Sequence, residues 1–391
     1  MDDWLQSELE IIKQRHLQRT LQSFATGNDP HAIINGQPYL LFSSNNYLGL
    51  ATDPRLKHKA IEAVEQFGVG SGGARLTTGN TVIHEQLEKE IASFKGTEAS
   101  LVFSSGYLMN IGVIAGLMSE GDVIFSDALN HASIIDGCRL SKAKTIVYQH
   151  ADMADLEEKL KQYPNANKKL IVTDGIFSMD GDIAPLPQIV QLAKTYDAYV
   201  MVDDAHATGV IGKNGGGTAA YFGLQADVHI TVGTLSKAVG AEGGFVATSQ
   251  LLVEYLRNKA RTFIFQTSLS PAVIQAAREG IRLIQKENER QQQLERNGQF
   301  LRSGLKKAGF TLADSSTPII AIIIGAAEKA VAFSEHVKKK GMFIPAIRPP
   351  TVQEGSSRLR MTVMATHTSE QLQYALETII EIGKKLAVIQ R

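Results

Sequence analysis

The sequence contains a single cysteine, Cys138, and shows no excess of charge of either sign. One thiol cannot form an intramolecular disulfide or a cysteine zinc cluster, so we expect a reducing compartment and no metal site. Lysine plus arginine and aspartate plus glutamate number 40 each, which leaves no net positive field to attract nucleic acid or an anionic membrane. We therefore predict a protein that binds neither.

Long hydrophobic runs are also missing. The longest, around residues 318–327, is too short to span a bilayer. The chain begins with Met1-Asp-Asp, and a signal or transit peptide would carry positive charge at that place. The 391 residues are 43% hydrophobic and 20% charged, which is ordinary for a globular protein with a large and a smaller domain. We expect a cytoplasmic protein.

The N-terminal segment has the pattern of an amphipathic helix. Apolar residues recur at helical spacing from Trp4 to about Thr26, among glutamine, lysine and arginine. We expect this helical arm to pack on its own domain or on a partner subunit. Arg19 lies within it, and the pattern alone favours a solvated charge there.

Strand and helix patterns alternate from Ala99 onward. Repeated units of this kind predict an α/β fold with a mostly parallel, doubly wound sheet and right-handed crossovers. A long helix from about Pro271 to Leu301 marks the passage into a second unit. We predict an N-terminal arm over residues 1–45, a large domain over 46–285, and a small α+β domain over 286–391.

Polar residues follow the predicted strands at their carboxyl ends, where ligands bind in doubly wound sheets. These groups are Ser105 to Tyr107, Asp127 to His131, Asp174 to Ser178, Asp203 to His206 and Thr234 to Lys237. Each group has an ordinary explanation in helix capping or turn formation. Their convergence on one sheet edge nevertheless favours a binding or catalytic site.

Some of these residues could bind a phosphate. Gly106 and Tyr107 begin a predicted helix, whose first backbone amides and dipole attract an anion. The hydroxyls of Thr234 and Ser236 could reach the same anion from across the sheet. The sequence therefore predicts a phosphate site at this edge.

Other residues at the same edge match the remaining parts of a pyridoxal phosphate site. Asp203 follows a buried strand and could hold a positive charge on a ring nitrogen, while an imidazole could stack on the ring. Lys237 also follows a buried strand, and the loss of hydration there would lower its pKa and make the amine nucleophilic. A lysine of this kind can anchor an aldehyde cofactor covalently.

These motifs resemble those of the α-oxoamine synthases, which are fold-type I pyridoxal phosphate enzymes that condense a small amino acid with an acyl thioester and release carbon dioxide. The resemblance covers nearly the whole chain. In chain order, the matching stretches are Asn45 to Leu50, Gly73 to Asn80, Ser105 to Tyr107, Asn130 to Ser133, Asp203 to Gly209 and Thr234 to Lys237.

The resemblance implies a role for each cofactor residue. Lys237 would anchor the cofactor and carry the α-proton, Asp203 would pair with the ring nitrogen, and His131 would stack on the ring. The other cofactor residues would be His206 and Ser178 on the oxygen side of the ring, and Gly106, Tyr107, Thr234, Ser236 and Thr267 at the phosphate, with Thr267 donated by the other subunit. A homodimer with a shared site follows.

The resemblance also implies substrate residues. Arg360 would bind the amino-acid carboxylate, Arg19 and Thr351 would lie near the acyl substrate, and Asn45 would contact substrate. The stretch from Ala346 to Val352 looks most like members that condense L-alanine with a pimeloyl thioester, carried by coenzyme A or by an acyl carrier protein.

Two alternatives stay open at this point. A sister enzyme of the family that uses glycine and acetyl-CoA shares every cofactor residue, and only the softer acyl-site features argue against it. A cofactor-free binding or scaffold protein on the same fold is the alternative from another class.

Overall fold

The predicted strands from Ala99 onward form a single sheet in the computed structural model, which describes residues 2–14, 18–19, 21–27 and 29–390. The seven strands lie in the order β3-β9-β8-β7-β6-β4-β5. Their bounds are β3 (Ala99–Phe103), β4 (Val123–Asp127), β5 (Lys144–Tyr148), β6 (Lys169–Asp174), β7 (Tyr199–Asp203), β8 (Ile230–Thr234) and β9 (Gly244–Thr248). Strand β9 pairs antiparallel with both of its neighbours, and the other neighbouring pairs are parallel. The predicted fold class is confirmed, although the alternation did not indicate β9.

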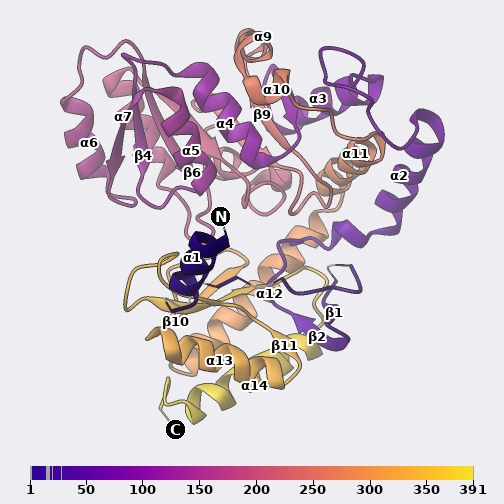
Figure 1. Cartoon of the computed structure of the whole chain (residues 1–391), viewed down its shortest axis with the longest axis vertical. Helices are drawn as coiled ribbons and strands as arrows, with labels where there is room; N and C mark the ends of the chain where they lie inside the picture. Colours follow the sequence, from indigo (N-terminus) through magenta and orange to yellow (C-terminus); the bar gives the residue numbers. More distant parts are fainter. Residues whose placement is uncertain (1, 15–17, 20, 28, 391) are drawn as a thin grey trace.

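Helices cover both faces of this sheet, as its apolar strands require. One face packs on α4 (Gly106–Leu117), α5 (Ala132–Ser141), α9 (Gln250–Lys259) and α10 (Arg261–Ile264). The other face packs on α6 (Met153–Lys161), α7 (Leu186–Tyr196) and α8 (Thr218–Phe222). Helix α3 (Val82–Lys95) packs beside β3, α11 (Pro271–Lys286) packs on α3, and α2 (Pro54–Phe67) packs on α11. The carboxyl ends of the parallel strands face the second lobe of the molecule (Figure 1).

The second lobe contains two small sheets and three long helices (Figure 1). One sheet has the order β10-β13-β12, and the other has the order β1-β2-β11. Their strands are β10 (Ile319–Gly325), β12 (Ala346–Ile347), β13 (Ser357–Thr362), β1 (His31–Ile34), β2 (Gln37–Leu41) and β11 (Met342–Phe343). The helices are α12 (Asn288–Lys307), α13 (Ala327–Lys339) and α14 (Ser369–Lys385). Residues near the N-terminus thus share a sheet with the C-terminal part of the chain.

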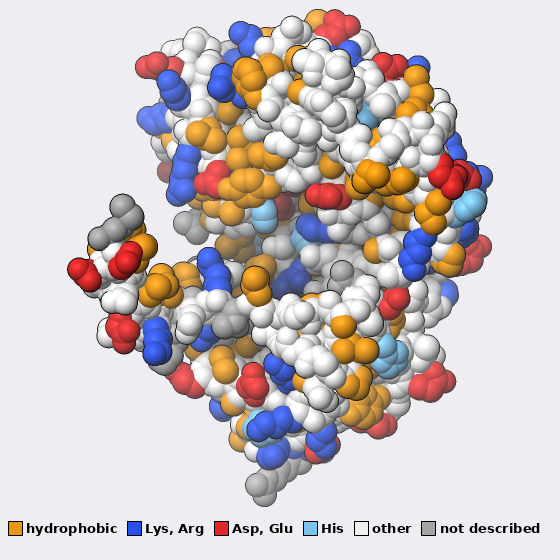
Figure 2. Space-filling model, turned by 45° about the vertical axis from the view of Figure 1, so that its right-hand side comes forward, with side chains coloured by type: hydrophobic (Ala, Val, Ile, Leu, Met, Phe, Trp, Pro, Cys, Tyr) orange, Lys and Arg blue, Asp and Glu red, His pale blue; other side chains and the backbone are white. Residues whose placement is uncertain are grey.

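The N-terminal helix is shorter than its pattern predicted. Helix α1 (Asp2–Gln14) ends well before Thr26, and residues 15–17 and 20 lie outside the described part of the chain. The helix prediction is wrong for residues 18–19 and 21–26, which are not helical; Phe24 forms a β-bridge with Ile34 instead. Every described side chain of α1 is exposed, so the expected packing on its own domain is not observed. Figure 2 shows α1 projecting from the body of the molecule.

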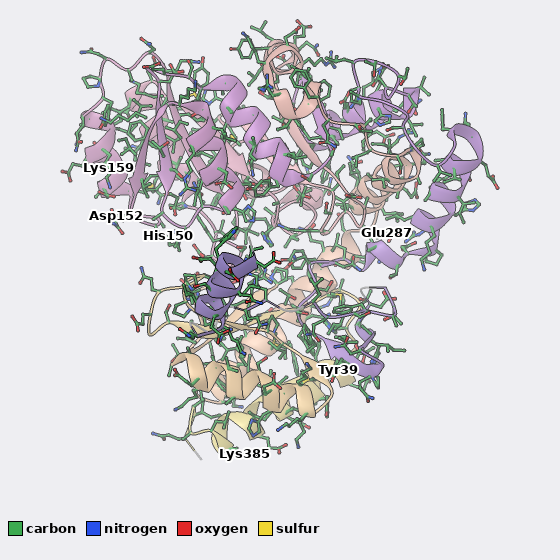
Figure 3. All side chains as sticks on the ribbon, viewed as in Figure 1. Tyr39, His150, Asp152, Lys159, Glu287 and Lys385 are labelled. Atoms are coloured by element: carbon green, nitrogen blue, oxygen red, sulfur yellow. The ribbon has the colours of Figure 1, made fainter. Side chains whose placement is uncertain are left out.

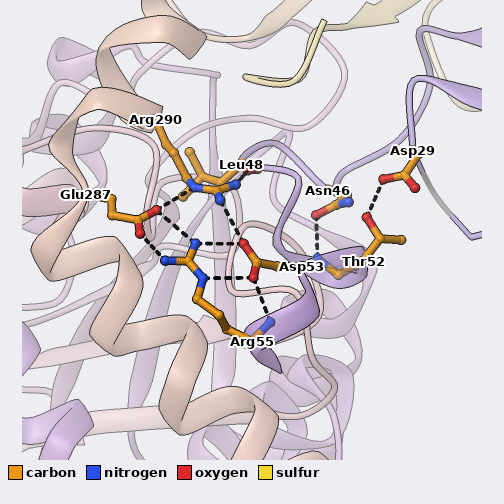
Figure 4. A network of polar contacts seen from close by, with 9 residues as sticks. Asp29, Asn46, Leu48, Thr52, Asp53, Arg55, Glu287 and Arg290 are labelled. Atoms are coloured by element: carbon orange, nitrogen blue, oxygen red, sulfur yellow. Dashed lines mark hydrogen bonds and ion pairs between the residues drawn. The ribbon is translucent and has the colours of Figure 1, made fainter. Parts of the chain in front are cut away.

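The expected long helix after Pro271 is also interrupted. Glu287 has non-helical backbone angles and separates α11 from α12. Its carboxylate forms ion pairs with Arg55 and with Arg290, at 2.8 Å to the latter (Figure 4). Arg290 in turn contacts the Asp53 carboxylate at 2.7 Å and donates to the carbonyl of Leu48 at 2.9 Å. This charged cluster fixes the start of α12 against the segment that leads into α2.

Among the described helices, none is long and apolar enough to cross a membrane.

Candidate active site

The connection between β8 and β9 carries Lys237 and is tied together by its own hydroxyls. Thr234 Oγ1 donates to the carbonyl of Gly243 at 2.8 Å and accepts from the amide of Ser236 at 3.1 Å. Ser236 Oγ accepts from the amide of Gly243 at 3.2 Å. These bonds hold Lys237 at the carboxyl end of β8, where the sequence predicted it.

Burial alters the acidity of Lys237. Desolvation lowers its pKa from 10.5 to about 8; the charge of Arg360 acts in the same direction, while Asp203 and Asp174 oppose the shift. This agrees with the lowered pKa that the sequence predicted. A substantial fraction of the amine is neutral near pH 8, which is the form that attacks a carbonyl carbon.

Asp203 lies at the end of β7 with its carboxylate buried and hydrogen-bonded. Its Oδ2 accepts from Asn110 Nδ2 at 2.6 Å, and its Oδ1 accepts from the amide of Ala205 at 2.9 Å. Asp174 stands beside it in register on β6. Burial and the neighbouring charge of Asp203 raise the pKa of Asp174 well above its usual value. Asp203 therefore presents a buried carboxylate that can face a cation, with the Asp174 carboxyl beside it.

His131 lies at the N-terminus of α5 and remains exposed to solvent. Its backbone amide donates to Asp174 Oδ2 at 2.9 Å, and its Nδ1 lies 2.7 Å from Ser133 Oγ. Partial burial of the imidazole lowers its pKa; Lys237 contributes to that shift and Asp203 opposes it. A neutral imidazole with an accessible ring is suited to stacking on an aromatic cofactor.

His206 is buried and bonded to a tyrosine that the sequence argument had not assigned a role. Its Nδ1 lies 2.7 Å from Tyr47 Oη, which also donates to Asn45 Oδ1 at 3.3 Å. Burial holds the pKa of His206 well below its usual value, and the charges of Lys237 and Arg360 reinforce the effect. Burial also raises the pKa of Tyr47 to about 12, so this pair is neutral.

The N-terminus of α4 has the geometry expected of the predicted anion site. Ser105 caps the helix by accepting from the amide of Leu108 at 3.1 Å. A Cβ atom on Gly106 would lie 3.4 Å from Thr234 Cβ, and one on Gly244 would lie 2.7 Å from the amide nitrogen of Gly106. The glycines therefore allow two strand ends to approach the helix start closely enough for a phosphate to be bound there.

Tyr107 follows Gly106 but is largely exposed, and its hydroxyl donates to Asp136. Thr267 lies near the same helix start within one chain, since its carbonyl accepts from Ser104 Oγ at 3.2 Å. Its donation by a second subunit stays a prediction.

Arg360 reaches the cluster from β13 of the second lobe. Its guanidinium is buried, and Nε donates to the carbonyl of Ser178 at 2.5 Å. Its charge acts on the pKa values of Lys237, His206 and Tyr47, so it lies close to all three. The structure thus brings a planar cation to the site that can bind a carboxylate through paired hydrogen bonds.

A cavity of about 640 Å³ lies between loops of the two lobes and includes Ser178 and Thr351 in its wall. Its apolar lining comes from Leu129, Phe177, Ile323 and Val352. Figure 2 shows the molecule hollowed between the lobes, with histidine and basic side chains in the hollow. The exposed Arg19 has no described contact with this cavity or with the lysine cluster.

Several residues at the site had been given no role of their own, namely Tyr47, Asn110, Ser133 and Asp174. Tyr47 and Ser133 lie inside the matching motifs, and Asp174 lies at a strand end, so their positions were a signal. Asn110 follows Gly106 by one helical turn, which places it on the same side of α4. The described residues contain no cluster of histidine, cysteine and acidic side chains suited to a metal.

The chain matches the family model described as aminotransferase class I and II over residues 37–379. It is 62% identical over 389 residues to the 8-amino-7-oxononanoate synthase of Lysinibacillus sphaericus, covering 100% of both chains. It is 52% identical over 389 residues to 8-amino-7-oxononanoate synthase 2 of Bacillus subtilis, again covering 100% of both. Among solved structures, a serine palmitoyltransferase variant from S. paucimobilis with bound pyridoxal phosphate superimposes with a TM-score of 0.93 at 34% identity, covering 99% and 98% of the two chains.

Proposed function

This chain belongs to the aminotransferase class I and II family, and we propose that it condenses L-alanine with a pimeloyl thioester. The products are 8-amino-7-oxononanoate, carbon dioxide and the free thiol, which is a step in biotin synthesis. The full-length similarity to 8-amino-7-oxononanoate synthases carries this choice of substrates. The protein is a pyridoxal-phosphate-dependent acyltransferase, and we propose the cytoplasm as its location.

The site's residues fit the cofactor. The glycine-lined start of α4 offers backbone amides to the phosphate, with Gly106, Tyr107, Thr234, Ser236 and Thr267 proposed as its ligands. Because the Thr234 and Ser236 hydroxyls already bond within their own loop, we propose that they stabilise the loop as well as the phosphate.

Bound pyridoxal phosphate supplies an electron sink that makes the α-proton of a bound amino acid removable. Lys237 anchors the cofactor and then carries that proton, because its lowered pKa lets the amine both accept and return a proton near neutral pH. With the cofactor bound, Asp203 would hold the proton on the ring nitrogen and His131 would stack on the ring. His206 and Ser178 would contact its oxygen side.

Substrate binding involves both lobes. Arg360 takes the carboxylate of alanine with its terminal guanidinium nitrogens, since Nε is already bonded to Ser178. Asn45 contacts the substrate beside the Tyr47–His206 pair. The acyl chain lies in the cavity that Thr351 lines, against the apolar side chains of its wall. Arg19 approaches the acyl substrate only if the N-terminal segment folds over the cavity.

We propose a homodimer with a shared site as the working assembly. Homodimers are common among enzymes of this fold, and the exposed Thr267 segment adjoins the phosphate site. The thioester carrier is coenzyme A or an acyl carrier protein. A decarboxylation assay with thioesters on each carrier distinguishes them by kcat/KM.

The test is a decarboxylation assay of the purified protein loaded with pyridoxal phosphate. Alanine, glycine and serine are each combined with acetyl and pimeloyl thioesters on both carriers. We expect alanine with the pimeloyl thioester to give the highest kcat/KM. A preference for glycine with acetyl-CoA would replace this assignment with the sister activity and leave the family unchanged. Preference for serine would point towards the reaction of the structurally similar palmitoyltransferase.

A further inference from the structure

Asn110 is a buried amide on α4 that contacts the carboxylate proposed to bind the ring nitrogen. Its Nδ2 donates to Asp203 Oδ2 at 2.6 Å and to Ser133 Oγ at 2.9 Å. Only 1% of the Asn110 surface is exposed, so solvent does not compete for these bonds. The amide must present its NH2 group to Asp203, because an ionised carboxylate accepts hydrogen bonds and cannot donate them.

The other end of this amide is unsatisfied. Among the described residues, Asn110 Oδ1 is buried without a hydrogen-bond partner. Leaving a buried carbonyl unpaired is unfavourable, and an apolar side chain at this position would avoid that cost. The two hydrogen bonds of the NH2 group are therefore the physical reason for an asparagine here.

Ser133 extends the contact to the imidazole. Its side chain is buried on the first turn of α5, and its Oγ lies 2.9 Å from Asn110 Nδ2 and 2.7 Å from His131 Nδ1. The hydrogen bonds thus run without a break from Asp203 through Asn110 and Ser133 to His131. This chain of bonds joins β7, α4 and α5 through buried side chains.

We propose that Asn110 and Ser133 are positioning residues that hold Asp203 and His131 in one fixed arrangement around the cofactor ring. The inference rests on the cofactor roles proposed for Asp203 and His131. Neither Asn110 nor Ser133 needs to touch the cofactor. Their effect is to fix the rotamers of the carboxylate and the imidazole before the ring enters, so that binding does not have to order them.

The test is a double-mutant cycle on cofactor affinity. The Kd for pyridoxal phosphate is measured by visible absorbance titration of the cofactor-free protein and of its Asn110→Ala, Ser133→Ala and doubly substituted forms. Each single substitution should weaken binding by about ten-fold, which corresponds to roughly 1.4 kcal/mol. Both residues act through one chain of bonds. The double variant should therefore lose little more cofactor affinity than whichever single variant binds the cofactor more weakly.

The matched control is Asn297→Ala. Asn297 is another buried asparagine on a helix, and its Nδ2 donates to the carbonyl of Met364 at 2.9 Å in the second lobe. The Asn297→Ala variant should lower the thermal midpoint of unfolding, as Asn110→Ala does. It should leave unchanged both the Kd for pyridoxal phosphate and the visible circular dichroism of the bound cofactor. The two positioning variants should weaken that dichroism, since a loosely held ring is less asymmetric.

Unchanged affinity and dichroism in both positioning variants would overturn the inference. The inference would also be overturned if the fold-loss of cofactor affinity in the double variant equalled the product of the two single fold-losses, because the residues would then act separately. If Asn110→Ala does not fold, the affinity and dichroism of Ser133→Ala decide alone. A parent protein that binds the cofactor but makes no product from alanine and pimeloyl thioester refutes the proposed substrates while leaving this test intact.

Discussion

At the scale of single residues, Lys237 shows how burial sets chemistry. Its pKa falls from 10.5 to about 8, so the folded protein exposes more neutral amine as the pH rises through that value. We predict that covalent capture of pyridoxal phosphate by the cofactor-free protein accelerates between about pH 7 and 9 and then levels off. Stopped-flow absorbance measures the rate. A Lys237→Ala variant should show no such phase, and a flat pH profile in the parent would contradict the prediction.

Arg360 gives the second prediction at this scale. Its Nε is bonded to the carbonyl of Ser178, which orients the two terminal nitrogens as a fork. Lysine keeps the charge but loses the fork, so Arg360→Lys should raise the KM for alanine by roughly 10- to 100-fold with a smaller change in kcat. The control is Arg278→Lys on α11, where the side chain pairs with Glu90 away from the site. Equal KM values for the two variants would refute the carboxylate role.

At the scale of elements, His150 connects the loops that follow three strands of the sheet. Its ring contacts Asp127 at the end of β4 and Asp182 after β6, each at 3.0 Å, and lies edge-on to Phe177 with the ring centroids 4.4 Å apart. Figure 3 shows His150 on the side of the large lobe that faces the small one. Burial alone would lower the pKa of His150, but the two carboxylates outweigh it and raise the pKa to about 10.

A pKa raised on folding stabilises the protein below the unfolded value near 6.5, and the contribution disappears as the pH rises to about 10. We predict that His150→Gln lowers the free energy of unfolding at about pH 6 by roughly 1 to 3 kcal/mol. The difference from the parent should shrink as the pH rises. Urea denaturation at several pH values measures it, and His58→Gln, at an exposed ion pair, is the control. A constant difference would show that His150 is not charged in the folded state.

The elements also show what the sequence could and could not predict. The sheet was predictable because its buried strands are apolar on both faces. The point where each apolar run stops marks the strand end, and this located the polar groups there. The extent of α1 was not, since apolar spacing continued to Phe24, where pairing with Ile34 decides the structure. The role of Asn110 was hidden because its partner Asp203 lies far away in sequence and only the packing of α4 on the sheet joins them.

At the scale of the whole molecule, the cluster around Asp53 joins the two lobes (Figure 4). Hydrogen bonds from Arg55 lower the pKa of Asp53 from 3.8 to about 2; its burial opposes this shift, and the charge of Arg290 supports it. A pKa lowered on folding stabilises the protein above about pH 4, and the contribution is lost as the pH falls through about 2.

Asp53→Asn keeps the cap of α2 but removes the charge that Arg55 and Arg290 share. We expect it to cost about 2 kcal/mol of unfolding free energy at neutral pH, and progressively less as the pH falls below about 4. Urea midpoints at neutral and acid pH measure the change. Glu62→Gln, at an exposed ion pair, should have little effect at either pH. A loss from Asp53→Asn that persists undiminished in acid would contradict the charge-based account.

The antiparallel strand β9 has one consequence for how the lysine can move. Strand β9 returns directly beside β8, so the segment from Thr234 to Gly244 is anchored in the sheet at both ends. Hydrogen bonds of Thr234 and Ser236 with Gly243 also tie the two sides of the segment together. The backbone of this segment has little freedom, and the amine of Lys237 can travel only as far as rotations of its own four-carbon side chain allow. Release and recapture of the anchor therefore need only rotations of this side chain and no opening of the fold.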